Sequence, residues 1–252
     1  MNKGFTLVEL AIVMTIIGLL IGGVLQGQQL LRNARATSQI KQFQQIEAGT
    51  ITFRDTYGYL PGDMPNARAR LPGCNTANSC VNGSGNSVVG RSTGAFENSQ
   101  TAAGALPGVE TTMFWKHLAL ANLINGIDTS AALRAPQWGK THPSSHFNGG
   151  LMIGFNDSDG GVVNTPETGH FILMHSNING NIGGQFIASQ ALPLSAMEAY
   201  IIDLKIDDGK PNLGSVIVEY IGSRCKTSDE ADAVYETSNN DAACFLWYKP
   251  AF

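Results

Sequence analysis

The stretch Met1-Asn-Lys-Gly-Phe5-Thr-Leu-Val-Glu9-Leu-Ala-Ile-Val-Met-Thr-Ile-Ile-Gly-Leu-Leu-Ile-Gly-Gly-Val-Leu25 decides the fold of this 252-residue chain. From Phe5 to Leu25 it contains 21 residues, of which Glu9 is the only charged one. At about 1.5 Å per residue, a helix of this length covers the roughly 30 Å hydrocarbon core of a bilayer. The sequence therefore predicts a helix that can cross a membrane.

The flanks of this apolar run distinguish it from a cleaved secretory signal. Such a signal has a basic region, a shorter apolar region of roughly 7–15 residues and a small-residue cleavage site. Here Lys3 is the only basic side chain before the run, and Gln26-Gly27-Gln28-Gln29 follows it without an A-x-A site. We therefore expect the apolar segment to remain part of the mature protein.

Glu9 is an acid within an apolar run, which normally indicates a pairing partner or a function. Insertion scales place the free energy of a charged residue at mid-membrane at about 2.5–3.5 kcal/mol. Arg32 and Arg35 lie more than six turns away, whereas a helical partner lies three or four residues away. The amino terminus of another copy, freed by cleavage between Gly4 and Phe5, would supply a positive charge at the depth of Glu9.

The segment Lys3-Gly4-Phe5-Thr6-Leu7-Val8-Glu9-Leu10 resembles the prepilin motif of type IV pilins and type II secretion pseudopilins. That motif has a short basic leader, a glycine, an aromatic residue, a Thr-Leu-hydrophobic-Glu sequence and an apolar helix. The resemblance implies that a prepilin peptidase cleaves between Gly4 and Phe5 and methylates the amine of Phe5. It also implies that Glu9 aligns each subunit against the next during assembly. The alternative for Glu9 is an acid at the membrane interface without a role in assembly.

A one-sided pattern follows the apolar run and predicts that the same helix continues. Residues that suit a buried stripe recur at spacings of three and four: Ile40, Phe43, Ile46 or Glu47, Thr50, Phe53 and Tyr57. Gly58 and then Leu60-Pro61-Gly62-Asp63 end the helix, because proline cannot continue it. We expect four regions: a leader (1–4), a transmembrane or filament-core segment (5–25), an amphipathic segment (26–57) and a globular periplasmic or extracellular head (58–252).

The composition of the chain bounds what the head can be. About 195 residues follow the helix, enough for one domain with a hydrophobic core. Charged residues make up 14% of the chain, against roughly 25% in typical soluble domains. The formal net charge of −4 does not indicate the basic surface that nucleic-acid binding requires. We therefore infer no nucleic-acid partner.

All four cysteines lie in the head, which fits an oxidising compartment. Four cysteines allow three pairings. Cys74 and Cys80 bracket a short polar loop, and Cys225 and Cys244 bracket a longer one, so we favour local pairing over the other arrangements. By the family resemblance, the second pair corresponds to the disulfide-closed C-terminal loop of many pilins. Zinc is the alternative use of four cysteines, and the chain has no C-x-x-C pair to support it.

The rest of the head sequence predicts two helices and four strands around an irregular region over 61–110. One helix is expected over 113–124, capped by Thr111 or Thr112. Another runs from a capping box of Ser195 and Glu198 to about Ile206. Strands are expected over 151–155, 170–174, 216–221 and 245–248. The sequence thus predicts an α+β fold in which an antiparallel sheet packs over the buried stripe of the long N-terminal helix.

Other residues with chemical potential have structural explanations. His142 and His146 are spaced four apart, but Pro143 and nearby glycines predict a loop, so no metal site is assigned. Asp157-Ser-Asp-Gly160 resembles the start of a calcium loop without the ligands that would complete it. Calcium in the head stays open, because some pseudopilins bind it there. Asp207-Asp208 suits the turn after a helix better than a metal site. No catalytic residue and no cofactor are assigned.

The resemblance implies a noncatalytic structural subunit of a filament. Such a subunit is inserted in the lipid of the inner membrane with its head in the periplasm. It is then processed by prepilin peptidase and joins other pilin or pseudopilin subunits at an inner-membrane assembly platform. The filament is a surface pilus or a periplasmic secretion pseudopilus. The alternatives are an adhesin at a filament tip, which shares the stalk, and a permanently tethered binding module or enzyme, in which Glu9 is incidental.

Overall fold

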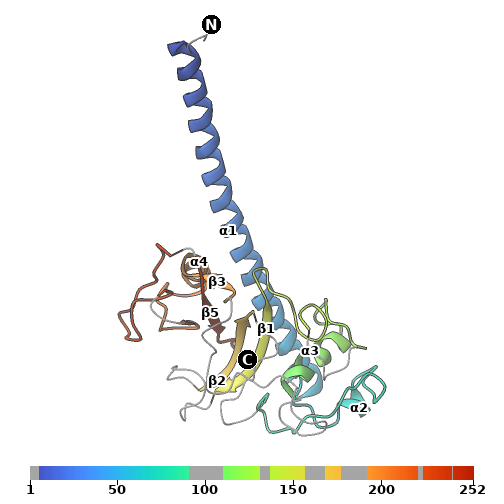
Figure 1. Ribbon diagram of the computed structural model, residues 1–252. Coiled ribbons are helices and arrows are strands. Elements are labelled where there is room, and N and C mark those ends of the chain that lie inside the picture. Colours follow the sequence, from blue (N-terminus) through green and yellow to red (C-terminus); the bar gives the residue numbers. More distant parts are fainter. Residues whose placement is uncertain are drawn as a thin grey trace.

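A long helix carries a globular head at its C-terminal end (Figure 1). The computed structural model describes residues 6–90, 110–130, 137–156, 168–176, 192–220, 224–239 and 241–252. Within these ranges the elements follow the order α1, α2, α3, β1, β2, β3, α4, β4 and β5. The long helix and an antiparallel sheet confirm the α+β fold expected from the sequence.

Helix α1 spans Leu7–Tyr57, a length of 51 residues. At about 1.5 Å per residue it is about 77 Å long. Gly58 ends the helix in the left-handed conformation with a φ of 80°, and its N–H donates to the carbonyl of Arg54. Glycine adopts this conformation without strain, which makes it a common helix terminator. The predicted end of the helix is therefore confirmed.

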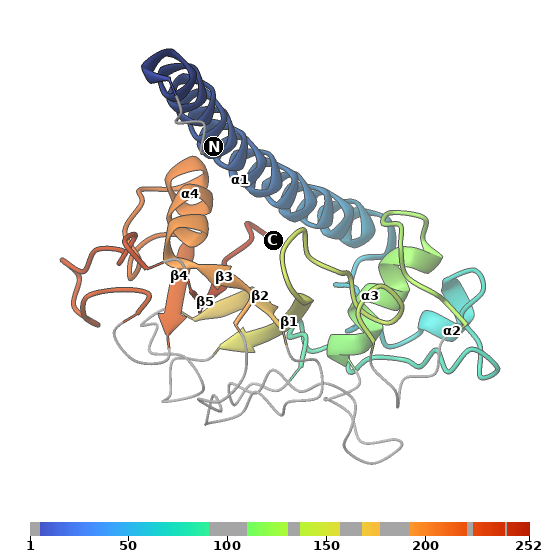
Figure 2. The ribbon, with the colours of Figure 1, turned by 45° about the horizontal axis from the view of Figure 1, so that its top comes forward.

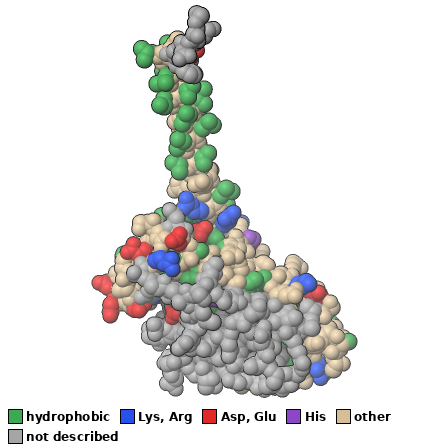
Figure 3. Space-filling model, viewed as in Figure 1, with side chains coloured by type: hydrophobic (Ala, Val, Ile, Leu, Met, Phe, Trp, Pro, Cys, Tyr) green, Lys and Arg blue, Asp and Glu red, His purple; other side chains and the backbone are tan. Residues whose placement is uncertain are grey.

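The two halves of α1 have different surroundings. From Leu7 to Leu31 the large apolar side chains are 45% to 89% exposed, and Figure 3 shows them as a bare apolar stalk beyond the head. The second half buries one stripe, which comprises Ala36, Gln39, Phe43, Ile46, Gly49, Thr50 and Phe53. The predicted stripe is confirmed at four positions, with Ile40 and Tyr57 half-buried at its edges.

Strand β5 (Ala242–Tyr248) is the centre of the sheet. It pairs antiparallel with β2 (Gly169–His175), β3 (Leu194–Ser195) and β4 (Val216–Tyr220), and β2 pairs antiparallel with β1 (Gly150–Asn156). The register places both Ile172 and Val216 opposite Tyr248. All four predicted strands are present with slightly different ends. Strand β3, with two residues, is too short to show a sequence pattern.

Both faces of the sheet are apolar. Because side chains alternate between the faces of a strand, Leu246 and Tyr248 lie in the core cluster that contains α1, while Phe245 and Trp247 lie in a second cluster. The rings of Phe43 and Tyr248 stack with centroids 4.8 Å apart and fix the sheet against α1. Figure 2 shows α1 above the sheet, with α4 and α3 toward opposite ends of it. Burial on both faces explains why the strand sequences are almost continuously apolar.

The two head helices differ in how well the sequence predicts them. Helix α4 (Ala196–Ile206) begins at the predicted capping box of Ser195 and Glu198. Helix α3 (Glu110–Leu120) begins earlier than expected, so the predicted caps Thr111 and Thr112 are wrong because both lie inside it. It also ends earlier, since Asn122 takes a φ of 57° and the Leu123 N–H donates to the Leu118 carbonyl. Asparagine tolerates this left-handed helix ending.

The region after α1 is mostly irregular, as predicted, with the short helix α2 (Ala67–Arg70) as its one helix over 58–90. The buried carboxylate of Asp63 organises this region. One of its oxygens accepts the N–H groups of Gly85 and Asn86 at 2.7 and 3.0 Å, and the other accepts the Ser87 N–H at 2.8 Å. The loop therefore wraps around Asp63, and the buried carboxylate of Glu110 accepts two further N–H groups from it, those of Ser84 and Gly90. The second half of the region, 91–109, lies outside the described residues.

Candidate assembly site

Thr6 and Glu9 close the N-terminus of α1. Thr6 is the N-cap, and its hydroxyl accepts the Glu9 N–H at 3.3 Å. One Glu9 carboxylate oxygen accepts the Thr6 N–H at 2.9 Å and the Thr6 hydroxyl at 2.8 Å. This reciprocal arrangement is a capping box, which satisfies N–H groups that a helix end leaves unpaired. In the isolated chain, the acid of the prepilin-like segment is thus held by its own helix end.

No basic side chain between Thr6 and the end of α1 lies close enough to form an ion pair with Glu9. Arg32 is the nearest basic residue along the helix, 23 residues away, which corresponds to about 35 Å. The Glu9 side chain is exposed. Gly4 and Phe5, between which cleavage is expected, lie outside the described residues. The pairing of Glu9 with the amine of another copy therefore stays a prediction.

Helix α1 is the one helix in the described ranges that is long and apolar enough to cross a membrane. A core helix of a soluble protein has similar length and composition but is mostly buried. None of the apolar window of α1 is buried by the rest of the chain. The apolar half of α1 is therefore available to lipid or to other helices.

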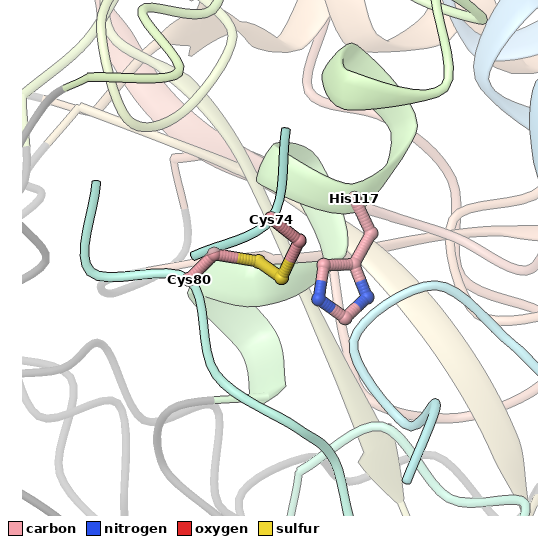
Figure 4. A group of neighbouring side chains, drawn as sticks. All are labelled: Cys74, Cys80 and His117. Carbon is pink, nitrogen blue, oxygen red and sulfur yellow. A yellow bond between two sulfur atoms is a disulfide. The ribbon is translucent and has the colours of Figure 1, made fainter. Parts of the chain in front are cut away.

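Two disulfides cross-link the head. Cys74 bonds to Cys80 and Cys225 to Cys244, with Cα–Cα distances of 5.2 and 5.4 Å, which is the local pairing. His117 lies beside the first disulfide (Figure 4). Because these sulfur atoms are bonded to each other, they cannot act as the thiolate ligands that zinc requires. This cluster is therefore a structural feature and not a metal site.

His117 connects helix α3 to the turn that follows α1. Its Nδ1 accepts the Gly62 N–H at 2.9 Å, which places the ring proton on Nε2, 3.3 Å from the Val81 carbonyl. Burial lowers the pKa of His117 to about 4. The ring is therefore neutral near pH 7, and it serves the fold as one acceptor and one donor.

The other histidines do not form a common site. His142 and His146 lie in a loop, as predicted, but His142 is buried and His146 is exposed. The His142 ring lies 2.9 Å from the Thr141 hydroxyl, and Nε2 of His170 on β2 accepts the Val89 N–H at 3.0 Å. Burial lowers the pKa of His142 to about 3 and that of His170 to about 4. Both of these buried rings are therefore neutral near pH 7.

Three carboxylates gather at the end of α4, with one oxygen of each within 4.8 Å of the others: Asp203, Asp207 and Asp208. Asp203 is buried and accepts the Tyr235 hydroxyl at 2.7 Å. Burial raises the pKa of Asp203 to about 7. Asp207 accepts the N–H and the hydroxyl of Ser215, which agrees with its interpretation as a turn residue. The other acidic candidate, 157–160, lies outside the described residues.

Glu47 has a role that its sequence neighbours do not indicate. Its carboxylate accepts the Tyr248 hydroxyl at 2.6 Å and the Ala251 N–H at 3.1 Å. These partners are 201 and 204 residues away along the chain. No local pattern could have signalled this connection, because it depends on how β5 packs against α1.

Residues 1–25 match the family described as the prokaryotic N-terminal methylation motif. This motif is the signature of type IV pilins and pseudopilins, and the long apolar helix that follows it in this chain fits that signature. The motif implies processing by prepilin peptidase and assembly with other pilin subunits. No match was found among curated proteins or among solved structures.

Proposed function

We propose that this chain is a noncatalytic structural subunit of a type IV pilus or of a secretion pseudopilus. Prepilin peptidase cleaves it between Gly4 and Phe5, and the methylated amine of Phe5 then pairs with Glu9 of a neighbouring copy. The observation that carries this proposal is the apolar half of α1, which the head leaves bare from Leu7 to Leu31. Most of this surface lies within the matched methylation motif, residues 1–25.

The bare half of α1 needs a second environment besides the membrane. Leaving a large aliphatic side chain in water forfeits about 1.5–3 kcal/mol relative to burial. Before assembly the bilayer buries these side chains, and in a filament a bundle of the same helices does so. Within such a bundle the carboxylate of Glu9 requires a partner, since an unpaired acid in an apolar environment is strongly unfavourable. In the filament, the amine of Phe5 from another copy replaces Thr6 as the partner of the Glu9 carboxylate.

The disulfides of the head support a location outside the cytoplasm. Disulfides persist in oxidising compartments such as the bacterial periplasm and the cell surface, and both pairs of cysteines are bonded. We infer that the head lies in the periplasm while α1 spans the inner membrane. Assembly at an inner-membrane platform then moves the head to a surface pilus or to a periplasmic pseudopilus.

The mature N-terminus tests the processing step. Mass spectrometry of the chain purified from its native membrane should give a first residue of Phe5 carrying one methyl group. An intact Met1, or a first residue beyond Leu25, would overturn the proposal. An intact Met1 is the result expected of a permanently tethered binding module or enzyme.

A set of single substitutions tests the assembly step. Glu9→Ala and Glu9→Gln both remove the charge, while Thr15→Val removes a polar group from the same apolar helix and is the matched control. We expect all three variants to insert in the membrane, and both Glu9 variants to enter filaments at least tenfold less than wild type. The proposed role of Glu9 fails if either Glu9 variant is incorporated as well as Thr15→Val.

A further inference from the structure

A cleft lies where the bare stalk meets the head. Its volume is about 470 Å³, and it is lined by Gln28, Leu31, Arg32 and Arg35 of α1 and by Ser195 and Glu198 at the start of α4. Figure 3 shows basic side chains gathered at this level of the molecule, directly below the apolar stalk. Because residues three apart lie on one face of a helix, Arg32 and Arg35 present two guanidinium groups to the same space.

The charge of this cleft is not neutralised by the described part of the head. Neither Arg32 nor Arg35 forms a hydrogen bond or ion pair with a described residue. The Glu198 carboxylate faces the cleft but accepts the N–H and the hydroxyl of Ser195, each at 2.9 Å. Lys205 adds a further positive charge nearby, with its Nζ 2.9 Å from the hydroxyl of Thr37. The cleft therefore keeps a net positive charge.

The position of the cleft along α1 matches the thickness of a bilayer. From Thr6 to Arg32 there are 26 residues, which span about 39 Å in a helix. A bilayer measures about 40–45 Å with its headgroups. When the N-terminal end of α1 lies at one membrane surface, the two arginines lie among the phosphates of the other.

The placement of these arginines is not explained by membrane topology. Positive residues close to a span favour the cytoplasmic side, whereas the proposed function puts the head, and with it Arg32 and Arg35, on the opposite side. Arg32 and Arg35 oppose the usual charge bias and have no partner in the described head. A ligand of opposite charge would explain their placement. At this depth, phospholipid phosphate is the abundant anion.

We propose that this cleft binds the phosphate of an anionic phospholipid in the leaflet that surrounds the head end of α1. The inference rests on the membrane-inserted precursor of the proposed function. The two guanidinium forks donate to the phosphate oxygens, the Gln28 amide lies beside them, and Leu31 lies toward the acyl chains. The contact fixes the depth of the head before assembly and is lost when the subunit leaves the membrane.

Native mass spectrometry of the full-length chain in mild detergent tests this site. Equal amounts of phosphatidylglycerol and phosphatidylcholine are added, and the lipids retained on the protein are counted. The test variant carries Arg32→Gln and Arg35→Gln. The control carries Lys41→Gln and Lys210→Gln, which removes the same charge from exposed positions that do not line the cleft.

Wild type and the lysine control should retain at least tenfold more phosphatidylglycerol than phosphatidylcholine, and the arginine variant should lose this preference. The proposal is overturned if the arginine variant keeps the preference or if wild type has none. It is also overturned if millimolar inorganic phosphate displaces the lipid, because the cleft is then a site for free phosphate. A change in dimerisation without a change in lipid retention would assign the cleft to a second copy instead.

The two proposals fail in different experiments. The arginine variant should still be cleaved before Phe5, since the cleft is far from the processing site. An arginine variant that keeps the lipid preference, or a wild type that has none, argues against the cleft alone when the N-terminus is processed normally. An uncleaved N-terminus in wild type argues against the proposed function, whatever lipid is retained.

Discussion

The hydroxyl of Tyr248 donates a 2.6 Å hydrogen bond to the carboxylate of Glu47, joining the last strand of the head to the stalk helix. The other oxygen of the same carboxylate accepts the Ala251 N–H, and the Tyr248 ring stacks on Phe43 of α1. Burial and the neighbouring acid raise the pKa of Tyr248, so its hydroxyl remains a donor. The C-terminal segment therefore binds the head to α1, through which a filament would hold each subunit.

We expect Tyr248→Phe to lower the free energy of unfolding of the head by about 1–3 kcal/mol, because the Glu47 carboxylate loses a charge-assisted hydrogen bond. Denaturant unfolding of the full chain in detergent measures the change. Glu47→Gln should be similarly destabilising, and the double variant should lose less than the sum of the two. Tyr59→Phe is a control at a half-buried tyrosine. Full additivity of the double variant would show that the two side chains are not coupled.

Asp63→Ala should destabilise the head more strongly than the loss of Tyr248. The Asp63 carboxylate accepts three N–H groups, and its Oδ1 also accepts the Ser84 hydroxyl at 3.1 Å. A hydrogen bond to a charged group contributes about 1.5–3 kcal/mol, and the buried Asp63 carboxylate loses four of them, so we expect a loss of roughly 3 kcal/mol or more. Hydrogen exchange should become faster at the amides of 85–87. Asp55→Ala, at an exposed position of α1, is the control, and equal effects of the two substitutions would contradict this role.

The sequence predicts best what depends on neighbours in the chain. The apolar run, the left-handed end of α1 at Gly58 and the capping box of Ser195 and Glu198 are all local patterns. The roles of Asp63 and Glu47 are not, because their partners lie about 20 and 200 residues away. Helix α3 ends earlier than predicted because Asn122 takes a φ of 57°, a conformation that asparagine tolerates but that its presence in the sequence does not dictate.

The same distinction applies to the sites. The prepilin-like segment around Glu9 is local, and so the sequence alone indicates processing and assembly. The basic cleft depends on α4 packing beside α1, with Ser195 lying more than 160 residues after Arg32. Its two arginines are visible in the sequence only as isolated charges after an apolar run.

The two disulfides should differ in their contribution to stability. Their sequence separations are 6 residues for Cys74–Cys80 and 19 residues for Cys225–Cys244. Because a longer closed loop restricts the unfolded chain more, replacing the second pair with alanine should destabilise the head by about 1 kcal/mol more than replacing the first. Denaturant unfolding of the two double variants measures this difference. The loop-entropy explanation fails if the shorter loop contributes more.

Asp203 should make the head less stable as the pH rises. Its folded pKa, raised to about 7 by burial, lies above its usual value of 3.8, so the folded state holds a proton that the unfolded state has released. The stability that the protonated Asp203 carboxyl gives the head is fully present below about pH 4 and is lost as the pH rises through 7. Asp203→Asn cannot ionise, and its unfolding free energy relative to wild type should therefore increase between pH 4 and pH 8. If the difference in unfolding free energy between Asp203→Asn and wild type stays constant over this range, the pKa of Asp203 is not raised in the folded head.

His117 should have the opposite effect. Its folded pKa of about 4 lies below its usual value of 6.5, so the unfolded state binds a proton more readily. The stability that depends on the neutral ring is present above pH 6.5 and is lost as the pH falls toward 4, by up to about 3 kcal/mol. His117→Asn keeps an acceptor for the Gly62 N–H but cannot titrate. It should be less stable than wild type at pH 7 and should lose less stability on acidification.

The matched control for His117 is a core variant without a titrating group. Phe114→Leu alters packing on the same helix, so its unfolding free energy should fall between pH 7 and pH 4 by the same amount as that of wild type. His142 and His170 contribute to the slope in all three proteins, and the comparison therefore isolates His117. If His117→Asn and Phe114→Leu show equal slopes, the ring of His117 is protonated in the folded head, and its bond from the Gly62 N–H is not formed.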